Sequence, residues 1–176
     1  MIRVGGRARV ARRTLLRASF LGVAGLAGAE VLASVAPFLT VRRIVGLGEP
    51  VPVGPKADLL ARFAATNDAP ILFSQGRFFL LHPPGGIVAA YRKCTHLGCA
   101  VPFSTAEDRF HCPCHGSIYD KRTAIVIRDP APKPLQLFHI REAESGLIVD
   151  TNPLNVIDRP DNRWDPRVIE IDDTAT

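Results

Sequence analysis

The chain has 176 residues, of which 47% are hydrophobic and 22% are charged, with four cysteines and a formal net charge of +5. This length suits one globular domain with accessory segments, and the apolar fraction excludes a disordered chain. The basic excess lies within residues 1–43, which hold eight arginines and one glutamate, whereas residues 44–176 carry a net charge of −2. This distribution argues against a nucleic-acid-binding protein and indicates a targeting or topology signal.

An apolar run over residues 18–41 follows the basic N-terminus and is long enough to span a membrane once, since a span needs about 20 residues. Six arginines precede the run and two follow it. The positive-inside rule therefore places residues 1–17 in the cytoplasm and the rest of the chain outside it. Glu30 interrupts the run, and we expect it to face a partner helix or the interface, or to be tolerated as a protonated or snorkelling carboxyl.

Residues 12–17 read Arg-Arg-Thr-Leu-Leu-Arg, which resembles a twin-arginine export signal. Such signals carry proteins that fold, often around a cofactor, before they cross the membrane. Ala11 stands where Ser or Thr is usual, and an ordinary signal anchor with a chance arginine pair is the alternative. The Ala-Gly-Ala triplet at 27–29 would permit cleavage, but the apolar run continues beyond it, so we expect a retained anchor.

Residues 42–57 are predicted to form a hinge or spacer, because Gly and Pro are dense between Gly46 and Pro55. A short helix is expected over 58–65. Short apolar runs separated by turn residues follow; they are Ile71–Phe73, Phe78–Leu81, Ile87–Tyr91, Arg109–His111, Ala124–Ile127, Leu135–Ile140 and Leu147–Val149. This spacing predicts a mainly β fold, an antiparallel sandwich or small barrel. The polar extension 152–176 is predicted to wrap the surface or fray, with 167–171 able to add an edge strand.

All four cysteines and three of the five histidines lie between Cys94 and His115. The two segments read Cys-Thr-His-Leu-Gly-Cys over 94–99 and Cys-Pro-Cys-His-Gly-Ser-Ile-Tyr over 112–119. Thiolates and imidazoles are the ligands of zinc and iron–sulfur centres, so the pattern predicts a metal site. A structural zinc site with two Cys and two His is one alternative. Against it, the Cys-x-His spacing is tighter than usual for zinc.

The two segments together resemble the signature of Rieske iron–sulfur proteins, and they are most similar to the Rieske subunit of cytochrome bc complexes. The resemblance implies a Rieske-type head over residues 58–151 with one [2Fe-2S] cluster and a cluster-binding subdomain. The metal ligands that it implies are Cys94, His96, Cys112 and His115. The two cysteines would bind one iron, and the two histidines would bind the other through Nδ1. A disulfide between Cys99 and Cys114 is implied as well.

Four further residues near the cluster take roles from the resemblance. Ser117 and Tyr119 match hydroxyl groups that donate to a bridging sulfide and to the Cys94 sulfur, which implies a potential in the upper part of the Rieske range. Leu97 would seat the loop tip against a cytochrome b subunit. Pro130 lies in a segment that resembles the proline loop covering the cluster.

Two glycines of the family pattern are replaced in this chain. Asp129 stands before Pro130, and Lys121–Thr123 stand where another glycine is expected. If these positions need a positive φ, the backbone must differ locally. The remaining histidines, His82, His111 and His139, are expected to be ordinary surface or strand residues.

The resemblance implies a membrane-anchored electron carrier in a dimeric, multisubunit cytochrome bc complex of the bacterial cytoplasmic membrane, with its head on the outer side. His115, or else His96, would hydrogen-bond a quinol and accept an electron and a proton together. The head would swing on its hinge and pass the electron to a c-type cytochrome. Such a chain is the iron–sulfur subunit of a quinol–cytochrome c oxidoreductase and is not catalytic alone.

Two other Rieske classes are alternatives. The small Rieske subunit of arsenite oxidase also carries a twin-arginine signal and a bridging disulfide, but the loop at 129–132 and Tyr119 fit the bc subunit better. Soluble Rieske ferredoxins and oxygenase components lack the second cysteine of each loop and need no anchor. Cys99, Cys114 and the apolar run therefore argue against that class.

Overall fold

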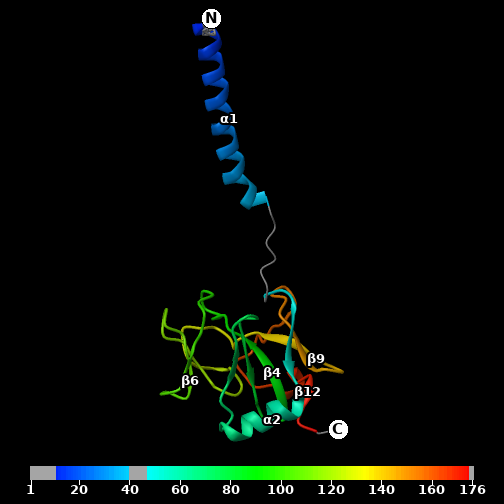
Figure 1. Cartoon of the computed structure of the whole chain (residues 1–176). Coiled ribbons are helices and arrows are strands. Elements are labelled where there is room, and N and C mark those ends of the chain that lie inside the picture. Colours follow the sequence, from blue (N-terminus) through cyan, green and yellow to red (C-terminus); the bar gives the residue numbers. More distant parts are fainter. Residues whose placement is uncertain (1–10, 40–46, 175–176) are drawn as a thin grey trace, which may run out of the picture. The chain divides into compact units, whose positions relative to one another are not determined.

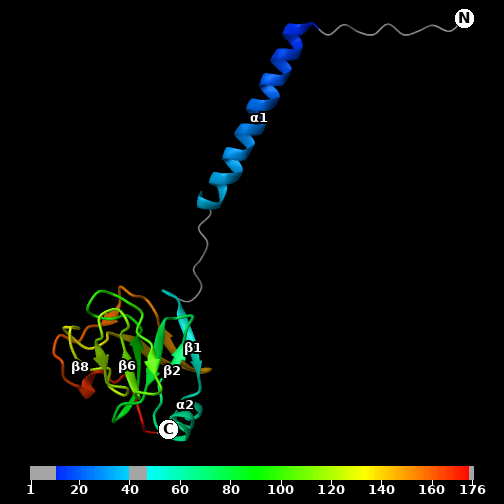
Figure 2. The ribbon, with the colours of Figure 1, turned by 90° about the vertical axis from the view of Figure 1, so that its left-hand side faces the viewer.

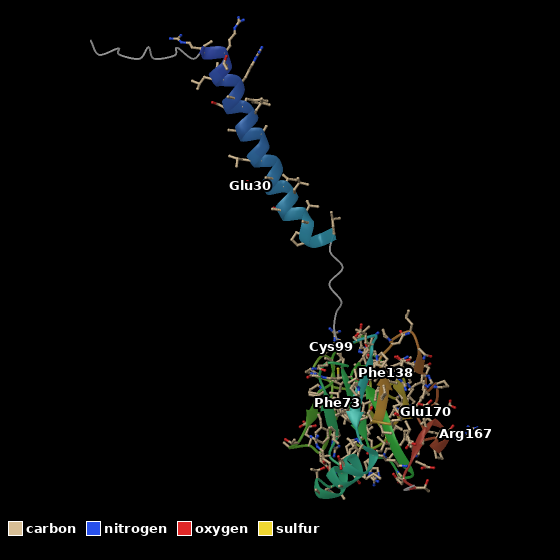
Figure 3. The ribbon with its side chains drawn as sticks, turned by 45° about the vertical axis from the view of Figure 1, so that its right-hand side comes forward. Glu30, Phe73, Cys99, Phe138, Arg167 and Glu170 are labelled. Carbon is tan, nitrogen blue, oxygen red and sulfur yellow. A yellow bond between two sulfur atoms is a disulfide. The ribbon has the colours of Figure 1, made fainter. Side chains whose placement is uncertain are left out.

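The computed structural model describes residues 11–39 and 47–174, which belong to two compact units, residues 1–43 and 44–176. In the first unit, α1 spans Arg12–Leu39 (Figure 1). Its stretch Arg12–Pro37 has a mean hydropathy of 1.6 and is long and apolar enough to cross a membrane, as predicted for the anchor. Figure 3 shows Glu30 on this helix. The arginines at 3, 7, 9, 42 and 43 lie outside the described residues.

The second unit, the head, is mainly β, with one helix, α2 (Lys56–Ala65). Its larger sheet is antiparallel, in the order β1 (Pro50–Gly54), β10 (Gly146–Asp150), β9 (Leu137–Ala143), β4 (Gly86–Tyr91), β3 (Phe78–Leu81) and β2 (Ile71–Phe73). Two short strands pair onto it, β11 (Val156–Ile157) with β9 and β12 (Ile171–Asp172) with β4. The head therefore confirms the predicted antiparallel β fold.

A smaller antiparallel sheet carries the second cysteine–histidine segment. Its order is β5 (Phe103–Ser104), β6 (Arg109–His111), β7 (Ile118–Tyr119) and β8 (Val126–Arg128). Strand β7 lies between β6 and β8, and Figure 2 shows β6 and β8 toward the left of the head, with β1 and β2 toward its right. One of the two predicted metal-binding segments thus lies on the smaller sheet, and the other follows β4 of the larger sheet.

Strands β3 and β4 divide the head into two cores, because successive side chains of a strand point to opposite faces. Phe78 and Leu80 lie in one core with the inner side of α2. Phe79 and Leu81 lie in the other, which also contains the buried cysteines of the metal-binding loops. All six residues of β4 are buried, since the strand has a core on each face.

The predicted hinge over 42–57 differs from the structure in its second half. Residues 50–54 form β1, an edge strand that pairs with β10 and buries Val51 and Val53. Its prolines are compatible with an edge position, where a missing N–H breaks no ladder. Gly48 is also fixed to the head, since its N–H donates to the carbonyl of Thr151 at 3.0 Å. Residues 42–46 of the predicted hinge lie outside the described residues.

The C-terminal extension wraps the head, with strands β11 and β12 and a short 3-10 helix over Pro166–Val168. The edge strand anticipated at 167–171 is present only at Ile171 and Asp172. Ile171 and Arg159 are buried, so the extension belongs to the folded head.

Candidate metal centre

The first metal-binding loop, residues 94–99, closes on itself through two backbone hydrogen bonds. The N–H of Cys94 donates to the carbonyl of Cys99 at 2.8 Å, and the N–H of Gly98 donates to the carbonyl of Cys94 at 2.9 Å. Gly98 has a φ of 81°, a left-handed conformation that a side chain disfavours. The glycine of the motif therefore allows the loop to turn back after His96.

The second loop, residues 112–117, repeats this arrangement. The N–H of Cys112 donates to the carbonyl of Ser117 at 2.8 Å, and the N–H of Gly116 donates to the carbonyl of Cys112 at 3.0 Å. Gly116 has a φ of 78°. The two loops are thus equivalent turns, each of which buries its leading cysteine and leads to a histidine.

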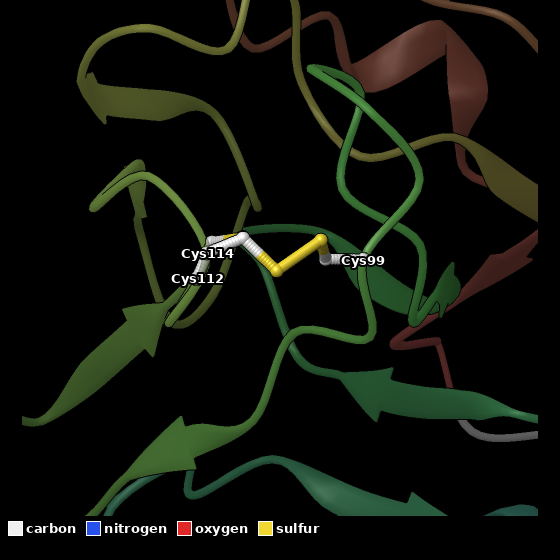
Figure 4. Close-up of side chains that lie close together, drawn as sticks. All are labelled: Cys99, Cys112 and Cys114. Carbon is white, nitrogen blue, oxygen red and sulfur yellow. A yellow bond between two sulfur atoms is a disulfide. The ribbon is translucent and has the colours of Figure 1, made fainter.

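A disulfide joins the two loops, as the resemblance implied. Cys99 and Cys114 are bonded, with their Cα atoms 6.7 Å apart (Figure 4). Their sulfurs and that of Cys112 lie within 4.8 Å of one another. Because two of these three sulfurs are consumed in the disulfide, this trio is not itself a set of metal ligands. The disulfide instead fixes the spacing of the loops.

The two remaining cysteines and the two histidines differ in solvent exposure, and together they are called the graded donor set. Cys94 and Cys112 are free thiols and buried, with exposed fractions of 3% and 1%. His96 is half-buried and His115 is exposed. The two imidazole rings have centroids 4.7 Å apart and are nearly perpendicular, at 86°. The thiols are therefore shielded from solvent, and the imidazoles are the more exposed members of the set.

One atom of this set lacks a hydrogen-bonding partner. Nδ1 of His96 is the single buried side-chain nitrogen or oxygen without such a partner in the part of the chain that the structure describes. An unsatisfied buried polar atom costs about 1–3 kcal/mol, and a metal ion would satisfy it. With two thiols and a second imidazole beside it, the donor set fits a mixed Cys and His iron–sulfur centre.

The two buried thiols are not electrostatically equivalent. Burial raises the pKa of Cys94, but hydrogen bonds with the Tyr119 hydroxyl and the backbone of His96 outweigh it and lower the pKa overall. Burial, together with the neighbouring Cys94, raises the pKa of Cys112. The pKa of Cys94 is therefore lower than that of Cys112.

Tyr119 directs a hydroxyl group at the Cys94 sulfur. Its oxygen lies 3.1 Å from Sγ and accepts the backbone N–H of Thr95 at 3.3 Å. Oγ1 of Thr95 lies 3.4 Å from the same oxygen, so the sulfur is the nearer acceptor for the Tyr119 proton. Burial raises the pKa of Tyr119 and keeps it a neutral donor. Thr95 is held in turn, because its hydroxyl donates to the carbonyl of Lys133.

Ser117 lies under the second loop and is fully buried. Its hydroxyl oxygen accepts the N–H of Ala131 at 3.0 Å, which ties the loop to the proline-rich segment at 129–132. Because that bond uses an oxygen lone pair, the hydroxyl hydrogen remains available for a second acceptor. Pro130 is exposed and follows a cis Asp129–Pro130 bond.

The two residues that replace family glycines have ordinary backbone conformations. Among the described residues, neither Asp129 nor Thr123 has a positive φ. The left-handed residue of this region is instead Ala124, with a φ of 53°. Ala124, next to the replaced position, is therefore the residue of this turn that has the left-handed conformation.

An open pocket lies beside the first loop. It has a volume of about 380 Å³ and is lined in part by His96, Leu97, Lys93 and Lys133. Leu97 is 69% exposed, which is high for a leucine. A ligand in this pocket would touch an imidazole and an apolar side chain together.

The other three histidines lie outside this donor set, as predicted. Each contacts a carboxylate: His82 with Asp68 at 2.7 Å, His111 with Glu107 at 3.0 Å, and His139 with Glu170 at 2.7 Å. Two residues that support the loops, Thr95 and Arg128, are not predicted from the sequence. The guanidinium of Arg128 donates twice to the carbonyl of Gly116, at 3.0 and 2.8 Å. No pattern around Arg128 could have indicated this role, which depends on β8 lying beside the second loop.

Known proteins share this region of the chain. The profile of the Rieske [2Fe-2S] domain family matches residues 50–139. The cytochrome b6-f complex iron-sulfur subunit 1 of a Nostoc species is 52% identical over 56 residues, which are 32% of this chain and 31% of that protein. The chloroplastic cytochrome b6-f iron-sulfur subunit of Chlamydomonas reinhardtii is 56% identical over 55 residues, 31% of this chain and 26% of that protein. The matches span about a third or less of these relatives.

Among solved structures, a cyanobacterial plasma membrane Rieske protein from Synechocystis is 29% identical, with a TM-score of 0.40. The alignment covers 56% of this chain and 97% of that protein. The family profile covers half of the chain, including both metal-binding loops, and the donor set within it fits the cofactor of the family. The chain therefore belongs to the Rieske [2Fe-2S] domain family and is an electron carrier with one such cluster.

Proposed function

We propose that the chain is the iron–sulfur subunit of a cytochrome bc-type complex, where it takes an electron from a quinol and passes it to a c-type cytochrome. The observation that carries the proposal is the graded donor set. Imidazoles lie at the surface beside an apolar side chain, and the thiols lie buried beneath them. An exposed imidazole can meet a quinol hydroxyl and, later, a partner protein.

In this proposal Cys94 and Cys112 hold one iron, and His96 and His115 hold the other through Nδ1. The bound cluster supplies a one-electron acceptor with a raised potential, because two neutral imidazoles replace two thiolates. His115 is exposed, so its outer nitrogen can accept a hydrogen bond from the quinol and then hold the proton. His96, on the rim of the 380 Å³ pocket, is the second candidate for that contact.

The proposed partners follow from the two units. The apolar helix anchors the chain in the bacterial cytoplasmic membrane, with the N-terminus in the cytoplasm and the head on the outer side. Leu97 contacts a cytochrome b subunit that holds the quinol. The similarity to iron-sulfur subunits of the cytochrome b6-f complex supports a membrane complex of this kind.

Exchange of Leu97 tests the proposal while leaving the cluster intact. In membranes that contain the whole complex, Leu97→Ser should lower quinol–cytochrome c reductase turnover about fivefold or more, as expected for an apolar contact at the centre of an interface. The cluster content and its EPR signal should not change. Leu154→Ser is the matched control, because Leu154 is 94% exposed on the loop between β10 and β11.

Equal turnover in the Leu97→Ser and wild-type membranes would contradict the proposed docking. Purification of the chain with a molybdenum subunit and without cytochrome b would contradict the bc assignment and favour the arsenite-oxidase class.

A further inference from the structure

The C-terminal extension places a buried guanidinium behind the metal centre. Arg159 has an exposed fraction of 4%, and its Nη1 donates to the carbonyl of Thr123 at 2.7 Å. Its Nε and Nη2 both donate to the carbonyl of Leu135, the former at 3.1 Å. No carboxylate of residues 11–39 or 47–174 forms an ion pair with Arg159. Burial accordingly lowers the pKa of Arg159 to about 10, which leaves it charged at neutral pH.

The two carbonyls that accept hydrogen bonds from Arg159 flank a backbone hydrogen bond between Leu135 and Ala124. The N–H of Leu135 donates to the carbonyl of Ala124 at 3.1 Å. The guanidinium thus clamps the turn after β7 onto the segment that leads into β9. Ala124 is buried and left-handed, which costs about 1–2 kcal/mol for a residue with a side chain. Within the turn, the Asp120 carboxylate accepts the N–H groups of Arg122 and Thr123, and Arg159 adds the link to the segment before β9.

This clamped turn directly follows Tyr119. The N–H of Asp120 donates to the carbonyl of Ile125 at 2.9 Å, and the N–H of Ala124 donates to the carbonyl of Asp120 at 3.0 Å. Tyr119 is therefore the last residue before a closed unit that Arg159 holds. Its hydroxyl lies 3.1 Å from the Cys94 sulfur.

The neighbouring Asp158 is linked to the same hydroxyl through Lys133 and Thr95. Its carboxylate accepts two hydrogen bonds from Nζ of Lys133, at 2.7 and 2.8 Å. The carbonyl of Lys133 accepts the hydroxyl of Thr95, whose N–H donates to the Tyr119 oxygen. Two consecutive residues of the extension therefore lead, by separate routes, to the contact between Tyr119 and Cys94.

We propose that Arg159 is a positioning residue that holds the Tyr119 hydroxyl against the Cys94 sulfur, so that the C-terminal extension sets the reduction potential of the cluster. A hydrogen bond to a ligand sulfur stabilises the reduced, more negative state. Loss of the clamp should lengthen that bond and lower the midpoint potential. The inference rests on the proposed ligation by Cys94 and does not depend on the quinol reaction.

A buried positive charge would favour the reduced cluster by itself, so the test must separate charge from geometry. Arg159→Lys keeps the charge and removes the planar fork that bonds two carbonyls at once. If geometry acts, this variant should lower the equilibrium constant for reduction about threefold to tenfold, the latter being about 59 mV for one electron. Arg163→Lys is the matched control, because Arg163 is exposed in the same segment.

The measurement is an EPR-monitored redox titration of membranes that contain the full-length chain. In a Tyr119→Phe background the hydroxyl is gone, so Arg159→Lys should produce little further change in midpoint potential. A merely structural role would lower the melting temperature of the head and leave the midpoint potential unchanged. If Arg159→Lys does not fold, Arg159→Gln in the same two backgrounds decides the matter, because its loss of charge acts in both backgrounds and only the geometric part of its shift requires the Tyr119 hydroxyl.

Two results would overturn the inference: an unchanged midpoint potential in a folded Arg159→Lys protein, or an equally large shift with and without the Tyr119 hydroxyl. Turnover with quinol is measured separately. If wild-type membranes oxidise no quinol, the proposed function is contradicted. A shift of the midpoint potential in the Arg159→Lys membranes would still support the positioning role.

Discussion

The hydroxyl oxygen of Tyr119 lies 3.1 Å from Sγ of Cys94, although 24 residues separate the two in the chain. The contact joins β7 of the smaller sheet to the first metal-binding loop. It lowers the pKa of Cys94 against the opposing effect of burial. A group that stabilises a thiolate also stabilises additional negative charge on a cluster bound to that sulfur, so with the proposed ligation by Cys94 this contact would link the fold to the redox chemistry.

Tyr119→Phe should lower the midpoint potential and retain the cluster. A hydrogen bond to a charged group contributes about 1.5–3 kcal/mol, of which the difference between the two redox states is a part. We expect a shift of roughly 60 mV, since a tenfold change for one electron is about 59 mV. Tyr91→Phe is the control, because Tyr91 lies in the other core. Equal potentials in the wild type and Tyr119→Phe would contradict the assigned role of the hydroxyl.

Ser117→Ala should affect both potential and stability. The substitution removes the acceptor for the N–H of Ala131 and leaves that buried group unsatisfied, at a cost of about 1–3 kcal/mol in the free energy of unfolding. It also removes the remaining hydroxyl donor beside the loops. Thermal unfolding and redox titration of the same sample test both effects. A lower potential with unchanged stability would show that the bond to Ala131 contributes nothing.

Removal of the disulfide should destabilise the pair of loops. Cys99 and Cys114 are 15 residues apart, and closing a loop of this size stabilises a domain by about 3 kcal/mol. The double variant Cys99→Ala/Cys114→Ala should therefore melt at a lower temperature and lose its EPR signal on mild heating. The disulfide constrains only the loops, so the far-UV circular dichroism at low temperature should stay the same. Survival of the EPR signal at the wild-type temperature would contradict this role.

The ion pair of Asp158 with Lys133 should make stability depend on pH in the acid range. Hydrogen bonds from Lys133 and Gln136 lower the pKa of Asp158 in the folded protein. A lowered folded pKa contributes stability that is present above the unfolded value, near 3.9, and is lost as the pH falls through the folded value. The difference in melting temperature between the wild type and Asp158→Asn should therefore shrink from pH 6 to pH 3. A constant difference over that range would contradict the ion pair.

Much of the fold follows from the sequence, because local apolar runs decide it. The runs at 71–73, 78–81 and 109–111 are strands with the predicted bounds. Strands β5 and β7 have two residues each and give no periodic signal, so they went unpredicted. The sequence predicts a hinge at residues 50–54, because Pro and Gly obscure the alternating positions of Val51 and Val53. This alternation is what fits the segment to a sheet edge.

The metal centre was predictable in its donors and not in its support. Cysteines and histidines are rare enough that two close clusters indicate a metal site, and the signature fixes their roles by resemblance. The clamp by Arg159 and the bond from Arg128 to Gly116 depend on which carbonyls the fold leaves nearby. Such contacts form only when the C-terminal extension and β8 have packed against the rest of the head, so no local sequence pattern predicts them.

The most direct test of the central claim is low-temperature EPR of the membrane fraction, reduced first with ascorbate and then with dithionite, together with metal analysis. We predict a rhombic signal that ascorbate already produces, in protein that holds iron and acid-labile sulfide. That result would establish a high-potential cluster with two histidine ligands. Protein that holds zinc and gives no signal, or a signal that appears only with dithionite, would contradict the account of a high-potential carrier that accepts electrons from a quinol.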